Sequence, residues 1–352
     1  PSSLDIGQPF MLLSDGLQSF IEQLINGFTV GSFYALIALG YTMVYGVLSM
    51  INFAHGDIFM VGSYWGLFAL SQTKEYGLLE SHPVLAIIIA FLTGMIGAAL
   101  TGITVERFAY RPLRKAGRLA PLISAIGTSI ILQEITRLLP TIGKAVLGIK
   151  IGSNLLFPQT FITGAMKQLN LFGGVAAKTY PAVLGTGGIT IFGIFITYSR
   201  VLIVGLSLTI MVVLYLLVRY SKIGFAMRAV SEDKNTALLM GVNVNRTIST
   251  TFFIGSALAG VAGVMVGLFY LQIRVDMGFV PGIKAFTAAV LGGIGSIPGA
   301  MIGGYLLGLV EVLSIQILPA VYKDVVAFVV LILTLIFMPN GLLGHRKFQK
   351  KL

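Results

Sequence analysis

The sequence predicts an all-α polytopic membrane protein, and three observations carry this prediction. Of the 352 residues, 56% are hydrophobic and only 11% are charged, whereas about 25% of the residues in an ordinary soluble domain are charged. Apolar runs close to the ~20 residues that a membrane-spanning helix needs recur along the chain. Glycine is abundant, with 43 residues, and lies mainly inside these runs, which is typical of closely packed or interrupted membrane helices.

The apolar runs leave no room for a soluble domain of any size between them. Seven runs are present, at residues 20–48, 84–105, 119–139, 201–218, 248–271, 285–310 and 325–338. The lengths and surroundings of the first and sixth runs do not fit one simple crossing each. We therefore expect about 8–9 transmembrane segments, some of them discontinuous or re-entrant.

Several glycines recur at a spacing of four residues, which lets the backbones of neighbouring helices approach closely. The pairs are Gly27 and Gly31, Gly263 and Gly267, Gly299 and Gly303, and Gly304 and Gly308. In so glycine-rich a chain each single pair is a weak signal.

The positive charges indicate the sidedness of the chain. The formal net charge is +11, and fourteen of the 24 basic residues lie in three short segments, 107–118, 219–246 and 346–351. Short loops rich in Lys and Arg stay in the cytoplasm, so we expect the N-terminus outside and the C-terminus in the cytoplasm. The basic residues lack the single basic face and aromatic platform of a nucleic-acid binder, so we expect no nucleic-acid partner.

The same pattern divides the chain into segments. Residues 1–19 contain no Lys or Arg and form an N-terminal extension, and residues 20–344 form one transmembrane domain. Within that domain we expect an external segment at 140–200, with a hairpin or a surface helix near its end, and a cytoplasmic loop at 219–247. Residues 345–352 form a basic cytoplasmic tail.

The first interrupted segment surrounds NFAHGD, residues 52–57. Glu22 and His55 are separated by 32 uncharged residues, which would make a helix of about 48 Å, too long for a hydrocarbon core of about 30 Å. We therefore expect one helix to end near this stretch and the next to begin around Ile58, within the membrane. Irregular backbone at that depth must be covered by protein or by a watery cavity.

The second interrupted segment is GGIGSIPG, residues 292–299. If 285–310 crossed the membrane once, the basic C-terminal tail would lie outside, against the charge rule. A fold-back at 292–299 returns the tail to the cytoplasm. Breaks in both halves of a chain are typical of transporters built from repeats, which bind their substrate near the interruptions. An inverted repeat fits this architecture, although the two halves show no residue-level match.

Residues at the two breaks are candidates for a substrate pathway: Asn52, His55, Gly56, Asp57, Gly292, Gly293, Gly295 and Ser296. The first four would cap and line a half-helix whose N–H groups attract a substrate carboxylate. The alternative is a purely structural cap, because Asp and Asn are ordinary N-cap residues. For Asp57 the sequence favours the capping role over direct contact with substrate. The two roles do not exclude each other.

The sequence shows no site for catalysis, metal or nucleotide. There are no cysteines and only three histidines, and the acids are dispersed, so we expect neither an enzyme nor a cofactor on this chain. The glycine-rich stretch 292–304 lacks the following Lys of a phosphate-binding loop. Glu134, Arg137 and Glu311 are interpreted as ion-paired or interfacial residues rather than as a proton relay.

A further signal is the polar run RAVSEDKNTALLMGVNVNRTI, residues 228–248. Its central part, from Glu232 to Met240, is compatible with a helix that ends at Gly241, a suitable C-terminal glycine. A solvated loop helix is the simpler interpretation. Docking to a soluble partner is the alternative.

Three blocks of the sequence carry a resemblance to a known family. They are NGFTVGSFYALIALGYTMVYGVLSMINFAHGDIFMVGSY near the N-terminus, RAVSEDKNTALLMGVN in the middle and KAFTAAVLGGIGSIPGAMIGGYLLGLVE near the C-terminus. They closely resemble the permease subunits of bacterial branched-chain amino-acid ABC transporters, specifically the H-type permease. The resemblance covers about residues 20–344 and is weakest in the external segment.

The resemblance implies a permease subunit of an ABC importer in the bacterial inner membrane, which forms the pathway for branched-chain or other neutral amino acids. The implied partners are a second homologous permease subunit, two cytoplasmic ATPase subunits that bind ATP and Mg, and an external, periplasmic substrate-binding protein. Membrane lipid surrounds the complex. Closure of the ATPases would switch the pore from inward-open to outward-open, and the amino acid would then enter a cavity near 52–57 and 292–296.

The resemblance also assigns a role to the polar run. In this family, the segment that matches 228–243 is a coupling helix that enters a groove on the ATPase. Glu232, Ala237 and Gly241 match the acidic, small and glycine positions of the family's loop signature, and Arg228 begins the segment. Asp233 stands where the family usually has a second alanine, so the docking role is carried over without individual contacts.

Rival functions come from the same and from other classes. A relative in the same superfamily could carry urea or amides. A stand-alone channel would conduct without ATPase partners, and a secondary transporter would need coupling-ion carboxylates inside the bundle, where this chain has few acids.

Overall fold

The computed structural model describes residues 7–114, 116–117, 119–147, 150–151, 154–155, 159–185, 187–191 and 194–344. The expected basic tail, 345–352, lies outside the described residues. Residues 7–19, expected as an extension, form the first turns of a long helix.

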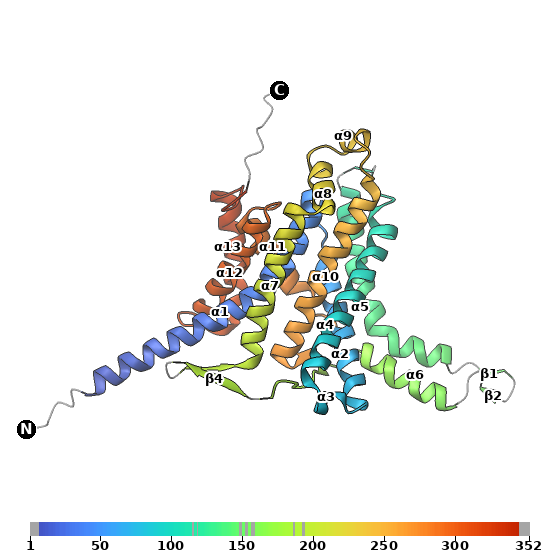
Figure 1. Ribbon diagram of the computed structural model, residues 1–352. Helices are drawn as coiled ribbons and strands as arrows, with labels where there is room; N and C mark the ends of the chain where they lie inside the picture. Colours follow the sequence, from blue (N-terminus) through green and yellow to red (C-terminus); the bar gives the residue numbers. More distant parts are fainter. Residues whose placement is uncertain are drawn as a thin grey trace, which may run out of the picture.

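Long helices make up most of the described chain (Figure 1). They are α1 (Gly7–Leu48), α2 (His55–Glu75), α4 (Pro83–Val105), α5 (Leu119–Leu147), α7 (Tyr198–Tyr220), α10 (Val244–Tyr270) and α12 (Ile297–Ser314). The shorter helices are α3 (Leu78–Ser81), a π-helical turn (Glu106–Tyr110), α6 (Gln159–Phe172), α8 (Lys222–Glu232), α9 (Lys234–Leu239), α11 (Phe279–Gly292), a 3₁₀ turn (Ala320–Tyr322) and α13 (Lys323–Phe337).

Three short antiparallel strand pairs complete the described elements. They join β1 (Lys150–Ile151) to β2 (Asn154–Leu155), β3 (Lys178–Thr179) to β6 (Gln272–Ile273) and β4 (Gly188–Ile191) to β5 (Ile194–Thr197). Near the end of segment 140–200 the sequence predicted either a hairpin or a surface helix. The structure has the hairpin, formed by β4 and β5.

The structure confirms the all-α membrane fold. Among the described residues, seven helical spans are long and apolar enough to cross a membrane: Gly16–Leu48, Pro83–Tyr110, Leu119–Val146, Tyr198–Tyr220, Val244–Tyr270, Ile297–Ser314 and Ala320–Phe337. The apolar helix α11 is shorter, with 14 residues. The helices are interrupted at 49–54, which overlaps the break predicted at 52–57, and at 293–296, within the break predicted at 292–299.

Helices α1 and α10 form the centre of the bundle. We compare an apolar stretch of 18 residues in each of these helices. In α1 and α10, 89% and 78% of its residues are buried, whereas in α5 and α7 only 22% are buried. The outer helices therefore present their apolar faces to lipid or to a partner.

Two glycines set the distance between α12 and α1. An added Cβ at Gly304 would lie 2.3 Å from the Cα of Ala35, and one at Gly308 would lie 2.3 Å from the backbone nitrogen of Gly31. Cβ atoms do not approach other atoms so closely, and only glycine fits at both positions. The close approach that the four-residue spacing predicted is therefore confirmed between these two helices.

The polar connections separate to the two ends of the bundle. In Figure 1, α8 and α9 lie at the top, near the end of the described C-terminal segment, and α3, α6 and β4 lie toward the bottom. Arg114 bonds to Asn245 at 2.7 Å, so the first two basic segments meet at the same end. We call the end formed by residues 107–114 and 219–246 the basic face.

Tyr180 anchors the segment between α6 and α7 to the bundle. Its ring is buried, and its hydroxyl donates a hydrogen bond to the carbonyl oxygen of Ser63 at 3.3 Å. An added Cβ at Gly267 would lie 2.5 Å from the Tyr180 ring, so α10 has room for this ring only because position 267 is glycine. This end of the bundle is therefore covered by packed structure.

We predict that Gly304→Ala destabilises the protein by about 1–3 kcal/mol, because the added methyl group forces α12 away from α1. Gly205→Ala in α7 is the matched control, because no atom lies within 4 Å of its Cβ position. This control should be neutral or stabilising by up to about 1 kcal/mol. Unfolding of both variants in lipid nanodiscs measures the difference, and equal stabilities would contradict the packing argument.

Candidate functional site

The first break lies between α1 and α2. Helix α1 ends at Leu48, and Ser49 leaves it with a positive φ of 57°. The side-chain oxygen of Asn52 accepts hydrogen bonds from the Ala54 N–H at 3.1 Å and from the Tyr110 hydroxyl at 2.7 Å. The Tyr110 bond ties the break to the end of α4, so protein covers its irregular backbone, as a membrane interior requires.

Asp57 joins α2 to α5. Its carboxylate accepts hydrogen bonds from the Ser129 hydroxyl and, at 2.8 Å, from the amide nitrogen of Gln133. Helix α2 begins at His55 rather than near Ile58, and its N-cap residue, Ala54, makes no side-chain capping bond. The expected capping role of Asp57 is therefore wrong, because both of its oxygens bond to α5.

His55 and Gly56 are enclosed between helices. The His55 ring is fully buried and lies edge-on to Tyr41, with 4.7 Å between the ring centroids. An added Cβ at Gly40 would lie 2.2 Å from Nε2 of His55, and one at Gly56 would lie 2.3 Å from the carbonyl oxygen of Gly278. These glycines let α1 and the start of α11 close around the break.

The second break lies between α11 and α12. Gly293 and Gly295 have φ values of 104° and 94°, which residues with side chains rarely adopt. The Ser296 hydroxyl caps α12 by accepting a hydrogen bond from the Gly299 N–H at 3.2 Å. An added Cβ at Gly292 would lie 1.9 Å from the carbonyl oxygen of Gly299. The two helices therefore fold back as a tight hairpin, as the sequence predicted.

The two breaks contact α11 at different points, and both also adjoin the basic face, the first through Lys234 at Leu48 and the second through Arg228 beside Gly295. Gly278, just before this helix, contacts Gly56, whereas Gly293 follows its last residue. The 14 residues of α11 span about 21 Å. The candidate pathway residues thus form two groups, 52–57 and 292–296. The end of α1 lies between them, since an added Cβ at Gly46 would be 3.9 Å from the Cα of Gly295.

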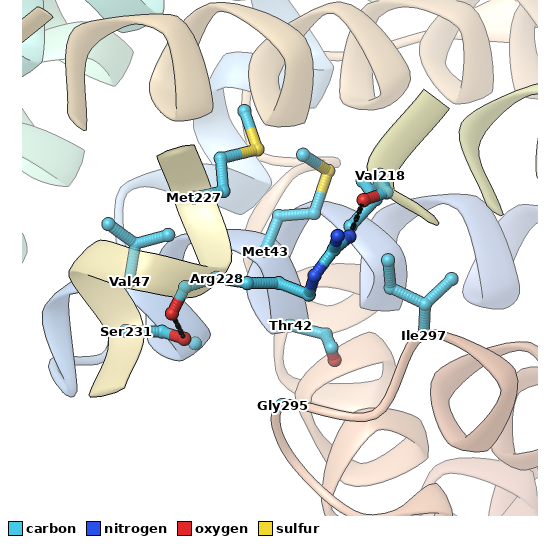
Figure 2. Close-up of a pocket in the computed structure, with 10 residues that line it drawn as sticks. Thr42, Met43, Val47, Val218, Met227, Arg228, Ser231, Gly295 and Ile297 are labelled. Carbon is cyan, nitrogen blue, oxygen red and sulfur yellow. Dashed lines mark hydrogen bonds between the residues drawn. The ribbon is translucent and has the colours of Figure 1, made fainter. Parts of the chain in front are cut away.

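A small cavity of about 80 Å³ joins the second break to α8 (Figure 2). Its lining residues are Thr42, Met43, Gly46, Val47, Val218, Met227, Arg228, Ser231, Gly295 and Ile297. In Figure 2 the Arg228 guanidinium donates a hydrogen bond to the carbonyl oxygen of Val218, at the end of α7. Helix α8 is therefore in direct reach of α1, α7 and the second break.

The segment that resembles a coupling helix forms two short helices. Helix α8 ends at Glu232, and Asp233 caps α9 by accepting a hydrogen bond from the Thr236 N–H. This N–H holds the pKa of Asp233 below its ordinary value. Gly241, with a φ of 84°, follows the end of α9, as predicted. The expected continuous helix from Glu232 to Met240 is wrong, because the extended backbone of Asp233 divides it.

Helix α9 presents an apolar patch at the tip of the basic face. Leu238, Leu239 and Met240 are 61%, 87% and 80% exposed, and we call these three residues the α9 patch. Ala237 beside them is buried and fixes the helix against its surroundings.

Lys234 connects α9 to the first break. Its ammonium group donates to the carbonyl oxygen of Leu48, the last residue of α1, at 3.5 Å. Burial lowers the pKa of Lys234, and the nearby Arg114 guanidinium lowers it further. A displacement of α9 would therefore act directly on the end of α1.

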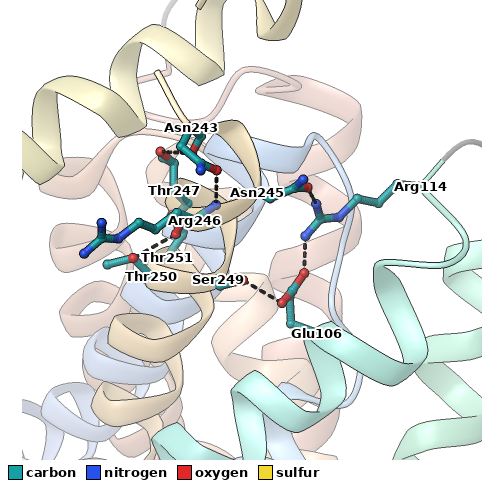
Figure 3. A network of polar contacts seen from close by, with 9 residues as sticks. All are labelled: Glu106, Arg114, Asn243, Asn245, Arg246, Thr247, Ser249, Thr250 and Thr251. Carbon is teal, nitrogen blue, oxygen red and sulfur yellow. Dashed lines mark hydrogen bonds and ion pairs between the residues drawn. The ribbon is translucent and has the colours of Figure 1, made fainter. Parts of the chain in front are cut away.

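A polar network holds the basic face together (Figure 3). Glu106 is almost fully buried and accepts hydrogen bonds from Arg114 and, at 2.8 Å, from the Ser249 hydroxyl. Arg114 also donates to the side-chain oxygen of Asn245 at 2.7 Å. The end of α4 and the start of α10 are thus joined by one buried carboxylate.

Sequence reasoning missed a buried ionic cluster at the opposite end of α11 and α12. The Lys284 ammonium group lies 2.8 Å from the Glu311 carboxylate and 2.6 Å from that of Asp324. The Tyr34 hydroxyl donates to Glu311 at 2.8 Å. The side chains of Lys284 and Glu311 are only 4% and 5% exposed. The lysine at the edge of the apolar run 285–310 was the signal that could have revealed this cluster.

The ion-pair interpretation of the three residues at helix ends is confirmed. Glu311 pairs with Lys284, and Arg137 lies 2.7 Å from Glu134 on α5. The second pair is exposed, with 40% and 43% of its side chains accessible, and contributes little to stability.

The comparisons with known proteins agree with this architecture. Residues 23–335 match the family described as branched-chain amino acid transport system / permease component. The chain belongs to this family. The permease is 43% identical to the high-affinity branched-chain amino acid transport system permease protein BraD of Pseudomonas aeruginosa, over 94% of the permease and 98% of BraD. It is also 43% identical to the corresponding protein LivH of Salmonella typhimurium, over 96% of the permease and 100% of LivH.

A solved structure, PsaBC from Streptococcus pneumoniae in complex with Fab, matches at 14% identity with a TM-score of 0.43. The match covers 94% of the permease and 97% of that chain. A likeness of this size carries no structural argument.

Membership of this family gives the chain its class. It is a multi-pass integral membrane protein, which in bacteria lies in the inner membrane, and it is a permease subunit of an ABC importer rather than an enzyme. Such a permease works in a transporter complex with other subunits, and family membership gives no reason to place a cofactor on this chain.

We predict that Lys284→Met costs about 3–5 kcal/mol of unfolding free energy, because it leaves Glu311 buried without its counter-charge. The double variant Lys284→Met/Glu311→Gln should be more stable than this single variant, since neither of the two charges remains. Equilibrium unfolding in lipid measures both values.

The exposed pair Arg274–Asp276 supplies the matched control for this cycle. Its side chains are 61% and 57% exposed, so Arg274→Gln should cost less than about 1 kcal/mol. Additive costs of Lys284→Met and Glu311→Gln would contradict the coupling of the two buried charges.

Proposed function

We propose that the permease carries branched-chain amino acids across the inner membrane as part of an ATP-driven importer. The observation that carries this proposal is the 43% identity to BraD and LivH, two branched-chain amino acid permeases, over nearly the whole of both chains. A match of this extent includes both breaks and the α8–α9 segment, so it concerns the working parts of the molecule.

The proposed complex contains a second homologous permease subunit, two ATPase subunits and an external binding protein. ATP and Mg²⁺ act on the ATPase subunits in this proposal. The basic face would lie in the cytoplasm, because short loops rich in Lys and Arg stay on that side. The N-terminus would then lie outside.

The α8–α9 segment would dock on an ATPase. Leu238, Leu239 and Met240 form an exposed apolar patch that a groove on a soluble partner can bury. Asp233 and Gly241 define the two ends of α9 and hold the patch in place. This support concerns the segment as a whole, and the predicted roles of Arg228 and Glu232 stay predictions.

Contacts within the chain suggest how ATPase closure would reach the pathway. Lys234 bonds to the end of α1, next to the first break, and α8 shares a cavity with the second break. A shift of the docked segment would therefore move both breaks. Regular helix geometry ends at each break, at Ser49 in the first and at Gly293 and Gly295 in the second.

The first break offers polar groups that suit an amino-acid zwitterion. Within the described chain, the amide nitrogen of Asn52 and both ring nitrogens of His55 are buried without a hydrogen-bond partner. When the surrounding helices part, these groups could bond to a carboxylate or an ammonium group, and the N-termini of α2 and α12 would favour the carboxylate. Direct contact of residues 52–57 and 292–296 with substrate stays a proposal.

The rivals differ from this proposal in energy source or cargo. A urea or amide importer would use the same machinery with another binding protein. A stand-alone channel would need no ATPase, and a secondary transporter would need free carboxylates in the bundle. The buried Glu106 and Glu311 are already paired with Arg114 and Lys284, which argues against ion coupling through these two acids.

The complex that co-purifies with the permease, reconstituted in lipid, tests the proposal. ATP hydrolysis should rise several-fold when an external binding protein loaded with leucine is added, and the same protein without leucine should have a smaller effect. If only a binding protein loaded with urea stimulated ATP hydrolysis, the cargo would be urea rather than an amino acid. Flux through the permease alone, with no associated ATPase, would reject the importer.

We predict that Gly241→Val uncouples ATP hydrolysis from uptake, whereas Gly241→Asn works nearly as well as the wild type. The space around Gly241 is open, with no atom within 4 Å of a Cβ, so only the φ of 84° opposes a side chain. The left-handed backbone conformation costs roughly 1–2 kcal/mol for most residues with a side chain, and Asn adopts this conformation more readily. Leucine uptake per ATP hydrolysed is the measurement, with Gly205→Val as the control for membrane insertion. Equal uptake by both Gly241 variants would contradict the coupling role.

A further inference from the structure

A second, larger cleft opens on the basic face between the end of α7, α8 and the start of α12. Its volume is about 670 Å³. It is lined by Tyr215, Val218, Arg219, Tyr220, Phe225, Arg228, Gly295, Ser296, Ile297 and Pro298. We call it the α7–α12 cleft. It adjoins the small cavity of Figure 2, with which it shares Arg228 and Gly295.

The α7–α12 cleft carries uncompensated positive charge. Two arginines line it, and no Asp or Glu is among its lining residues. In the described chain neither Arg219 nor Arg228 has a carboxylate within ion-pair distance. The N-terminus of α12, capped by Ser296, also opens into the cleft and adds a partial positive charge.

Aromatic rings hold the two guanidinium groups in place. Arg219 lies 5.7 Å from the ring centroids of both Tyr215 and Tyr220, and it bonds to the Tyr215 hydroxyl. Arg228 lies 4.5 Å above the Phe225 ring. Such contacts orient a guanidinium without neutralising it, so both groups can still bind an anion.

An apolar stripe leads from the cleft along α7. Leu208, Val212 and Leu216 are 45%, 53% and 46% exposed, and their spacing of four residues places them on one side of the helix. Arg219 and Tyr215 lie on that same side by helical periodicity. The stripe extends about 16 Å from Arg219 to Leu208, toward the middle of the membrane.

This combination fits one chemical class of ligand. A phosphodiester supplies the negative charge and the hydrogen-bond acceptors that two guanidinium groups and a helix N-terminus select. Acyl chains attached to it match the apolar stripe. Tyrosines at the level of the headgroups are typical of the membrane interface, and basic pockets between helices on the cytoplasmic side bind anionic headgroups.

We propose that the α7–α12 cleft is a binding site for an anionic phospholipid of the cytoplasmic leaflet, with the phosphodiester between Arg219 and Arg228 and the acyl chains on the α7 stripe. The site rests on the proposed orientation of the permease, and not on its cargo. Since the cleft includes the second break and part of α8, the bound lipid joins the coupling segment to the hairpin of α11 and α12.

Native mass spectrometry of the detergent-extracted complex tests this site. The probes are phosphatidylglycerol, phosphatidylcholine with the same acyl chains, and inorganic phosphate. Phosphatidylglycerol should bind at least tenfold more tightly than phosphatidylcholine. Arg219→Gln should weaken phosphatidylglycerol binding roughly fivefold, the effect of one basic residue near an anionic membrane surface. Val212→Asn should weaken lipid binding by interrupting the stripe.

Arg111→Gln is the matched control, because Arg111 is an exposed arginine of the basic face outside this cleft. It should leave phosphatidylglycerol binding unchanged, and the unfolding temperature confirms that each variant is folded.

Equal binding of the two lipids, or no effect of Arg219→Gln, would overturn the site. Phosphate binding as tight as that of the lipid would also overturn it, in favour of a site for free anions. A cross-link between the second permease subunit and the cleft would also overturn the site, because the cleft would then be occupied by that subunit and not by lipid. Because binding is measured without transport, these outcomes are independent of the proposed cargo.

Discussion

The structure depends on one constraint, that a bilayer interior offers no water to backbone groups that leave a regular helix. Two interrupted stretches lie next to the basic face, and each is covered by other parts of the chain. At the first break, the side-chain oxygen of Asn52 accepts hydrogen bonds from the Ala54 N–H and from the Tyr110 hydroxyl. At the second break, the N–H groups of Leu342 and Leu343 donate to the carbonyl oxygens of Leu291 and Gly292 at 2.8 and 2.9 Å. The C-terminal segment thus satisfies the end of α11, and the breaks become stable features that can still change shape.

Glycine makes this coverage possible. Only a residue without a side chain lets Gly56 meet Gly278, or lets α12 approach Ala35 of α1. The absence of side chains has a second effect at Gly293 and Gly295, whose backbone turns in a direction that other residues rarely adopt. A single composition bias, the high glycine content, therefore supports both the tight central packing and the turn at the second break.

Charge is distributed according to the same constraint. The buried acids are paired, Glu106 with Arg114 next to the basic face and Glu311 with Lys284 inside the bundle, because an isolated buried charge is costly. At the basic face, charges meet solvent and headgroups, and guanidinium groups such as Arg219 can be left unpaired. The interior charges thus join helices to one another, whereas the surface charges remain free for partners. The α9 patch and the α7–α12 cleft lie on this surface, close to both breaks.

The sequence alone determined the membrane class, the approximate position of both helix breaks and the glycine that ends the α8–α9 segment, because these follow from local patterns of hydrophobicity, charge spacing and glycine placement. It could not show how the two groups of candidate pathway residues lie relative to α11, since this depends on how distant helices pack. The same holds for Asp57, whose carboxylate turns from its own helix to Ser129 and Gln133. Only the tertiary structure decided which groups compete for each hydrogen bond, and it alone brought Lys284 to Glu311 and Asp324 from three different helices.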